Sequence, residues 1–130
     1  MLTAAAMCLA LNMFFEARNE PLVGRQMVAE VTLNRVASKS YPNTICEVVW
    51  QKNQFSWTHD GLSDDPTKLG YLDREAWKEI KMTAQIILSD PDQYLPKTGA
   101  THYHADYVWP YWTDDMEYLG KVGTHLFYKN

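Results

Sequence analysis

The sequence predicts an α+β fold in which a mainly helical domain carries a small antiparallel β-sheet. Three long segments before residue 90 combine strong helix formers with apolar residues at helical spacing. From residue 100 onward, β-branched and aromatic residues take over in a pattern typical of strands. The chain has 130 residues, 46% of them hydrophobic, and shows no linker or repeat. We therefore expect residues 1–130 to form a single domain with a packed core.

The first predicted helix runs from about Thr3 to Ala17, a segment rich in Ala, Leu and Met. Glu20 and Pro21 end it, because the residue before a proline avoids the helical conformation. Pro21 can occupy the first turn of a second helix, where its missing N–H group costs nothing. An apolar stripe at helical spacing extends this second helix to about Ser38.

The middle of the chain predicts a short helix, a loop and a third long helix. Thr44 and Glu47 have the spacing of a capping box, which starts the short helix. Residues 51–70 are rich in Asn, Ser, Asp, Gly and Pro, so we expect a loop there. Asp73 is predicted to cap the third long helix, which ends near Leu88, just before a proline.

Two strands are predicted near the C-terminus. Residues 101–108 favour a strand that places His102 and His104 on the same face. Residues 119–128 read as its partner, with two glycines that mark a bend or bulge. Together they predict the small antiparallel sheet packed on the helices.

Charge and aromatic content narrow the function classes. The formal net charge is −4 and no basic run appears, so the chain lacks the electrostatic footprint of a nucleic-acid-binding protein. The five Trp and eight Tyr residues exceed what a small core needs. Because sugars offer flat C–H faces that pack on aromatic rings, we expect some of these rings to line a groove. We expect a monomer without a cofactor.

The N-terminal segment from Met1 to Phe15 is apolar but does not read as a targeting signal. It lacks a basic start, and Glu16 and Arg18 follow at once without a small-residue cleavage site. It is also too short to span a bilayer, so we expect no membrane insertion.

Cys8 and Cys46 are the only cysteines. The two could bridge, but a chain of this length needs no disulfide to fold. We expect both to be free thiols, with Cys8 buried in the first helix.

Glu16 is the strongest candidate for catalysis. It lies near the C-terminal end of an apolar helix, where the helix dipole disfavours an ionised carboxylate. Phe14 and Phe15 would exclude water and raise its pKa in the same way. A carboxyl group that keeps its proton near neutral pH suits a general acid. The alternative interpretation is that Glu16 pairs with Arg18 or caps a neighbouring backbone group.

A resemblance to a known family supports the catalytic interpretation. The run Glu16-Ala-Arg-Asn-Glu20-Pro-x-x-Gly24-Arg-Gln26, followed by Val31-x-x-Asn34-Arg35-Val36, resembles the SleB/CwlJ family of cell-wall hydrolases. That family commonly has E-A-R-G-E-P-x-x-G-Q, so Asn19 replaces a glycine and Arg25 is an extra residue. The likeness continues in the same order through Gln54–Trp57, Ala100–His104, Pro110–Trp112 and Gly123–Tyr128.

The resemblance implies a lysozyme-like lytic transglycosylase that acts on peptidoglycan glycan strands, with Glu16 as the acid and then the base. Such an enzyme breaks the β-1,4 bond between N-acetylmuramic acid and N-acetylglucosamine and leaves a 1,6-anhydro sugar. A hydrolase would need a second carboxylate. Glu20 is the nearest, unless it caps the second helix. We expect Glu20 and Tyr103 to be auxiliary residues, and we expect the substrate-binding residues to be Gln54, Phe55, Trp57, His104 and Trp112. On the second helix, we expect Asn34 and Arg35 to face the cleft or to pair with carboxylates, with Arg35 as either a structural partner or a ligand.

Two other functions remain open. A zinc amidase that cuts the muramoyl–alanine link could use His102 and His104, completed by His125 or Asp106. Two histidines on one strand are a weak signal for zinc, so we expect no metal. A wall-binding module without catalysis would also explain the aromatic content, but it has no use for Glu16.

The expected location follows from the resemblance and the absence of a signal peptide. A wall hydrolase without an export signal must leave the cell in another way. A phage endolysin in the host cytoplasm, released through a membrane lesion at lysis, fits this pattern. The catalytic domain of a longer bacterial protein fits it as well.

Overall fold

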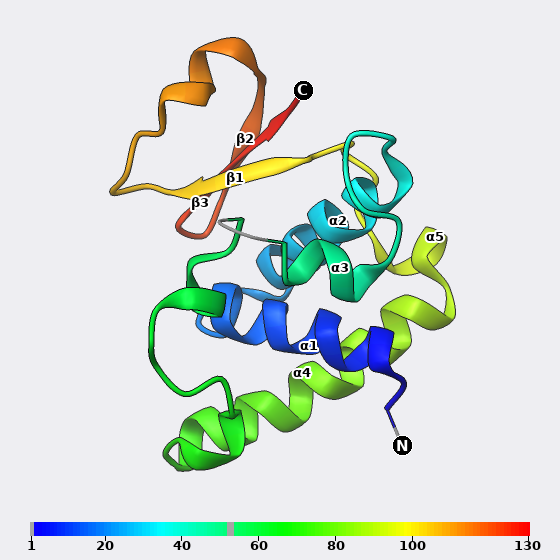
Figure 1. The fold of residues 1–130 in the computed structure, drawn as a ribbon, viewed down its shortest axis with the longest axis vertical. Helices are drawn as coiled ribbons and strands as arrows, with labels where there is room; N and C mark the ends of the chain where they lie inside the picture. Colours follow the sequence, from blue (N-terminus) through cyan, green and yellow to red (C-terminus); the bar gives the residue numbers. More distant parts are fainter. Residues whose placement is uncertain (1, 52–53) are drawn as a thin grey trace.

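The computed structural model describes residues 2–51 and 54–130 and shows a layer of helices beneath a three-stranded sheet (Figure 1). The α+β prediction is confirmed. The helices are α1 (Ala4–Ala17), α2 (Leu22–Ala37), α3 (Ile45–Val49), α4 (Tyr71–Ser89) and α5 (Pro91–Tyr94), and the strands are β1 (His102–Ala105), β2 (Glu117–Val122) and β3 (His125–Lys129). Short 3₁₀ segments cover Ser56–His59, Pro66–Lys68 and Tyr111–Asp115. None of the described helices is both long and apolar enough to cross a bilayer.

Helix α1 lies at the centre of the helical layer and packs on α2, α3 and α4. Thr3 begins it as predicted, because its hydroxyl accepts a hydrogen bond from the backbone N–H of Ala6 at 3.1 Å. Its buried side chains, among them Met13 and Phe14, pack with Trp77 and other residues of α4. This packing fixes the axis of α1, and therefore the position of its last turn.

The sheet has the strand order β1-β3-β2, with both pairs antiparallel. The single strand predicted for residues 119–128 is wrong, because two strands and a tight turn occupy this region. Gly123 adopts a positive φ of 59° at the turn, a conformation that favours glycine. Gly120 marks the predicted bulge, where the register between β2 and β3 shifts after Tyr118.

Two predicted helix starts also need correction. Helix α4 begins at Tyr71 with Gly70 at its N-cap, so Asp73 lies in the first turn and does not cap it. The Asp73 carboxylate instead accepts a hydrogen bond from Nε of Arg18 at 3.0 Å. Pro21 is the N-cap of α2 and not a residue of its first turn.

The predicted loop and the end of α4 contain more structure than expected. Two 3₁₀ segments lie within residues 51–70, while residues 52 and 53 of that loop are outside the described part of the chain. The proline at position 91 ends α4 and also starts the short helix α5, whose N-cap Asp90 accepts a hydrogen bond from the N–H of Gln93.

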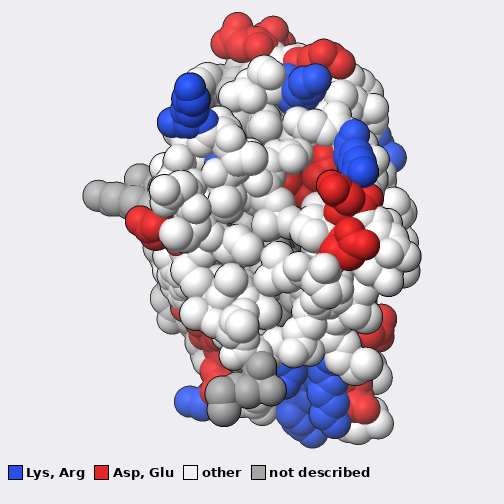
Figure 2. All heavy atoms as spheres, turned by 90° about the vertical axis from the view of Figure 1, so that its right-hand side faces the viewer, with Lys and Arg blue, Asp and Glu red and all other residues white. Residues whose placement is uncertain are grey.

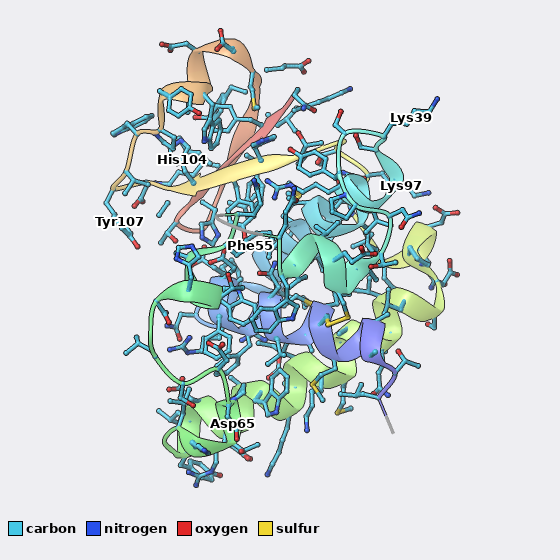
Figure 3. All side chains as sticks on the ribbon, in the orientation of Figure 1. Lys39, Phe55, Asp65, Lys97, His104 and Tyr107 are labelled. Atoms are coloured by element: carbon cyan, nitrogen blue, oxygen red, sulfur yellow. A yellow bond between two sulfur atoms is a disulfide. The ribbon has the colours of Figure 1, made fainter. Side chains whose placement is uncertain are left out.

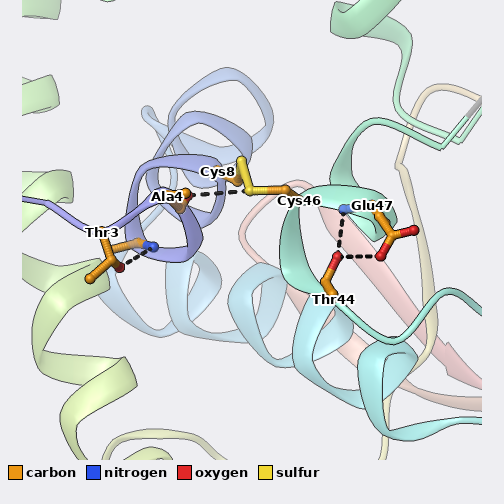
Figure 4. The surroundings of a disulfide bond; sticks show 7 residues. Thr3, Ala4, Cys8, Thr44, Cys46 and Glu47 are labelled. Carbon is orange, nitrogen blue, oxygen red and sulfur yellow. Dashed lines mark hydrogen bonds between the residues drawn. A yellow bond between two sulfur atoms is a disulfide. The ribbon is translucent and has the colours of Figure 1, made fainter.

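Cys8 and Cys46 form a disulfide between α1 and α3 (Figure 4), so the prediction of free thiols is wrong. Chain length gave no information about the local packing, which brings the two Cα atoms to 5.3 Å. Thr44 helps to place Cys46, because its hydroxyl caps α3 by accepting from the N–H of Glu47. The predicted capping residue of α3 is therefore confirmed.

The charged side chains are scattered on the face shown in Figure 2. Lys and Arg lie in small groups beside Asp and Glu, around a broad area of other residues. The non-grey atoms of this view form no extended basic surface.

The disulfide predicts a loss of stability on reduction. Replacing both cysteines by serine should lower the free energy of unfolding by about 2–4 kcal/mol, because the unfolded chain then regains the freedom of a long loop. Urea unfolding with and without dithiothreitol measures this loss. The double variant should not respond to the reductant, and a wild-type protein that also fails to respond would contradict the bridge.

Candidate active site

Glu16 lies in the last turn of α1, at the boundary between the helical layer and the sheet. Its side chain is partly exposed and lines a hollow of about 320 Å³, which we call the Glu16 hollow. The walls come from the α1–α2 corner, the end of β1 and the β2–β3 turn. They comprise residues 15–20, Ala105, Tyr107, Thr124 and His125.

The environment of Glu16 favours its protonated form. Burial raises the pKa of its carboxyl group, although the hydrogen bond from Tyr103 and the charge of Arg35 act in the opposite direction. Arg18 does not pair with Glu16, because its guanidinium binds Asp73 and lies 4.7 Å from the centre of the Phe14 ring. The ion-pair interpretation of Glu16 is therefore not supported within the described residues.

Tyr103 holds the Glu16 carboxyl group from the sheet side. Its hydroxyl donates a hydrogen bond of 2.6 Å to Oε1 of Glu16. The pKa of Tyr103 lies well above its ordinary value, because burial and the neighbouring Glu16 both disfavour the phenolate. Tyr103 therefore remains a donor over the physiological pH range. Its ring is fixed between those of Phe55, His125 and Phe127.

Glu20 lines the same hollow, but its carboxylate is engaged by the β2–β3 turn. It accepts hydrogen bonds from the backbone N–H of Thr124 at 2.7 Å and from the Thr124 hydroxyl at 3.1 Å. Nδ1 of His125 lies 3.6 Å from it. A Cβ atom at Gly123 would clash with Oε1 of Glu20, and the φ of Gly123 is positive, so both the space and the backbone favour glycine there. Glu20 does not cap α2, whose N-cap Pro21 makes no side-chain hydrogen bond.

A second hollow of about 520 Å³ lies on the other side of Tyr103, and we call it the Arg35 hollow. It is lined by Arg35, Gln54, His102, Tyr103, Pro110, Tyr111 and Trp112. Arg35 is buried; its Nε donates to the backbone carbonyl of Thr101 at 2.8 Å, and its Nη1 donates to Oε1 of Gln54 at 3.2 Å. The structure thus brings Gln54 and Trp112 together at this site.

Phe55 and Trp57 do not reach either hollow, and the prediction that they contact sugar is corrected. Their exposed fractions are only 3% and 4%. Trp57 stacks on Phe15 and donates its indole N–H to Oδ1 of Asn12 at 2.8 Å. Phe55 lies between the sheet and the helices (Figure 3), where it packs near Tyr103. Both rings therefore pack behind the site, Trp57 against Phe15 and Phe55 against Tyr103.

His104 is also buried and lines neither hollow, which corrects its predicted contact with substrate. Its Nδ1 donates to the carbonyl oxygen of Ala105, 2.7 Å away, because that oxygen can only accept. Its Nε2 forms a hydrogen bond of 2.9 Å with the Tyr128 hydroxyl. Its ring packs against Trp109 and Trp112. His104 therefore positions Trp112, which does line the Arg35 hollow.

The histidines named for a zinc site do not converge. His102 and His104 share one face of β1, as predicted, whereas His125 lies beside Tyr103 on the opposite face. Burial and the charge of Arg35 lower the pKa of His102 to about 4. Among residues 2–51 and 54–130, no group of three or more His, Cys, Asp or Glu side chains could hold a metal ion.

Two exposed tyrosines belong to the site although they were not predicted to do so. Tyr107 lines the Glu16 hollow and Tyr111 lines the Arg35 hollow, with exposed fractions of 81% and 91%. Figure 3 shows Tyr107 beyond the end of β1, in the segment that leads to β2. The aromatic density of residues 106–116 was the available signal, but it did not indicate which rings face outward.

Comparisons with known proteins place the chain among enzymes of the cell wall. A sequence profile described as Cell Wall Hydrolase matches residues 19–128, a range that begins just after Glu16. A spore cortex-lytic enzyme of Bacillus cereus is 29% identical over 116 residues, which are 88% of this chain and 40% of that protein. The chain therefore spans about 40% of the length of this curated relative.

Two solved structures share the fold. The catalytic domain of the germination-specific lytic transglycosylase SleB from Bacillus anthracis is 27% identical, with a TM-score of 0.72, and the match covers 98% of this chain and 97% of that one. The catalytic domain of the Bacillus cereus SleB protein is also 27% identical, with a TM-score of 0.69, and the coverage is 99% and 93%.

The contact between Glu20 and the β2–β3 turn predicts a sensitive glycine. Gly123→Ala should lower the free energy of unfolding by at least about 2 kcal/mol, because alanine is strained at this φ and displaces the Glu20 carboxylate. Gly70→Ala is the matched control, with no atom within 4 Å and an ordinary φ. Its expected cost is about 0.5–1 kcal/mol at an N-cap. Equal losses in chemical denaturation would contradict the turn contact.

The raised pKa of Glu16 predicts a stability gain on its removal. The folded state holds this proton more tightly than the unfolded state, so ionising Glu16 costs stability as pH rises above about 4.5, the ordinary glutamate value. Glu16→Gln should therefore gain stability over wild type as pH rises from 4 to 8. Thermal unfolding of both proteins across this range measures the gain, and a variant that loses stability relative to wild type as pH rises would contradict the assigned environment.

Proposed function

The chain belongs to the Cell Wall Hydrolase family, and from this premise we propose that it cleaves the glycan strands of peptidoglycan as a lytic transglycosylase. The observation that carries the proposal is the Glu16 carboxyl group, which lines an open hollow, has a raised pKa and is held by Tyr103. The likeness to the SleB catalytic domain over nearly the whole chain supports the same reaction.

In the first step, Glu16 acts as the general acid. Tyr103 occupies Oε1, which leaves Oε2 for the transferable proton. Glu16 gives this proton to the glycosidic oxygen between N-acetylmuramic acid and N-acetylglucosamine while the C1–O bond breaks. Positive charge then develops on the anomeric carbon of the muramoyl residue.

In the second step, the Glu16 carboxylate acts as the base. It takes the proton from the 6-hydroxyl group of the same muramoyl residue, whose oxygen attacks the anomeric carbon. The new C1–O6 bond closes a 1,6-anhydro ring, and Glu16 returns to its protonated form. No water is consumed, and one carboxyl group serves both steps. Tyr103 keeps this group in place throughout and is a positioning residue.

The contacts of Glu20 favour this route over hydrolysis. A hydrolase needs a second carboxylate that acts as a nucleophile or activates water. Glu20 is the only other carboxylate on the Glu16 hollow among the described residues, and both of its oxygens accept hydrogen bonds from Thr124. We therefore assign Glu20 to the support of the turn. An amidase or a purely binding role has less support, because neither requires an acid at this position.

We also propose that the chain works on the cell wall as a monomer, without nucleic acid or membrane insertion. It would act either as a phage endolysin released at lysis or as the catalytic domain of a longer bacterial protein. The Cys8–Cys46 bridge supports a place of action outside the reducing cytosol, because disulfides persist mainly in oxidising compartments.

The two carboxylates predict different losses of activity. Glu16→Gln should reduce the rate of wall lysis by at least ~10²-fold, in line with a lost general acid. Glu20→Gln should lose less than about tenfold, because the amide oxygen still accepts from the turn. Release of soluble muropeptides from purified peptidoglycan measures both rates, with circular dichroism as the check on folding. Retained activity in Glu16→Gln would contradict the assignment.

Product analysis separates the competing reactions. Mass spectrometry of the digest should show 1,6-anhydromuramic ends, which are one water lighter than reducing ends. Reducing ends would instead indicate a hydrolase, with Glu20 as its second carboxylate. Freed peptides that disappear with a chelator would indicate the zinc amidase.

A further inference from the structure

The Arg35 hollow contains a buried cation without an acidic partner. Among the described residues, no carboxylate lies within 4.0 Å of the Arg35 guanidinium, and no Asp or Glu lines the hollow. Its hydrogen-bond partners are the neutral oxygens of Thr101 and Gln54. Buried charges are normally paired, because desolvation of an isolated ion is costly.

Glu16 interacts with this charge at longer range, but no described neighbour within 4.0 Å neutralises it. The rings of Tyr41 and Phe55 face the guanidinium, with their centres 5.0 and 5.4 Å from Cζ, which stabilises a cation but leaves its charge in place. His102 has a lowered pKa and remains neutral at physiological pH. The described lining of the hollow therefore includes one cation and no carboxylate, in a chain whose formal net charge is −4.

The walls of the hollow suit a sugar that carries an acid group. Its volume of about 520 Å³ falls within the range of small-molecule sites. Tyr111 and Trp112 contribute aromatic rings to its lining, and Gln54 contributes an amide. The hydrogen bonds of the Arg35 guanidinium in the described part of the chain involve Nε and Nη1, which leaves Nη2 without a protein acceptor there. A carboxylate can accept two parallel hydrogen bonds from such a guanidinium.

We propose that the Arg35 hollow is a subsite for a carboxylate carried by the muramoyl residue, held by the Arg35 guanidinium beside the Tyr111 and Trp112 rings. This inference rests on the proposed function. It adds to the bond that is cleaved a second feature of the substrate, the carboxylate that the enzyme recognises. Two sources offer the same chemistry. The carboxylate is either the free lactyl group of a strand without peptides or an acid group of the attached stem peptide.

The position of the subsite connects it to catalysis. Tyr103 lines the Arg35 hollow and donates to Glu16, which lines the other hollow, so the two sites share one side chain. A muramoyl residue anchored through its carboxylate would thus be held next to the side chain that positions Glu16. Neutral chitin-type oligosaccharides lack this anchor.

The test compares charged and neutralised strands in a binding experiment that needs no turnover. Glu16→Gln is titrated calorimetrically with soluble glycan strands, either bearing their peptides or stripped by an amidase. Each kind is used in its native form and after its carboxylates have been converted to amides. We expect at least about tenfold weaker binding of the amidated form in one arm, because a charge-assisted hydrogen bond is lost. The arm that shows this gap identifies the source.

The same titrations are repeated with Arg35→Gln added to Glu16→Gln, and native and amidated strands should then bind with affinities within about twofold of each other. The control is Arg74→Gln, which replaces an exposed arginine on α4 and should leave the affinity difference between the two forms unchanged. Arg35→Lys serves if the glutamine variant does not fold, and it should narrow the gap because lysine lacks the planar fork. Equal binding of native and amidated strands, or a gap that survives the loss of Arg35, would overturn the subsite. Failure of Glu16→Gln to bind any strand would instead contradict the proposed function as well.

Discussion

The hydrogen bond between Tyr103 and Glu16 is the constraint on which the site depends. It joins the last turn of α1 to β1 and so connects the helical layer to the sheet at one point. The bond has two effects: it orients the carboxyl group, and it lowers the pKa that burial raises. Burial is the larger effect. The acid therefore keeps a raised pKa while its geometry is fixed.

Polar residues of α2 hold β1 in the position that this bond requires. Glu30 is buried, and its carboxylate accepts from the N–H groups of Thr98 and Gly99. Asn34 donates to the carbonyl of Ala100, and Arg35 donates to that of Thr101. Four consecutive residues before β1 are thus tied to one helix. The same face of α2 supplies both the support of the catalytic acid and the cation of the proposed subsite.

Local signals in the sequence predicted the helices that deliver the site. The run of Ala, Leu and Met and the Glu20-Pro21 stop placed the end of α1, and with it Glu16, correctly. Alternation predicted the sheet and the shared face of His102 and His104. These features are determined by residues a few positions apart in the chain, so they can be predicted from a single sequence.

Features set by distant partners could not be predicted in this way. Aspartate is a residue type that often caps helices, but the carboxylate of Asp73 accepts a hydrogen bond from Arg18, which lies 55 residues earlier in the chain. Trp57 points inward because Asn12 accepts its indole N–H. The contact of Cys8 with Cys46 depends on how α1 and α3 pack. The burial of Phe55 and the exposure of Tyr111 likewise follow from tertiary packing, so the aromatic residues indicated a groove without showing which rings line it.

The central claim is that Glu16 holds a proton at a pH where an ordinary glutamate has lost it. Carbon-13 NMR titration of the glutamate carboxyl groups in the intact protein, with the Glu16 signal assigned by its absence in Glu16→Gln, tests this claim most directly. The account predicts a Glu16 pKa above the ordinary value of 4.5. A pKa at or below that value would contradict it.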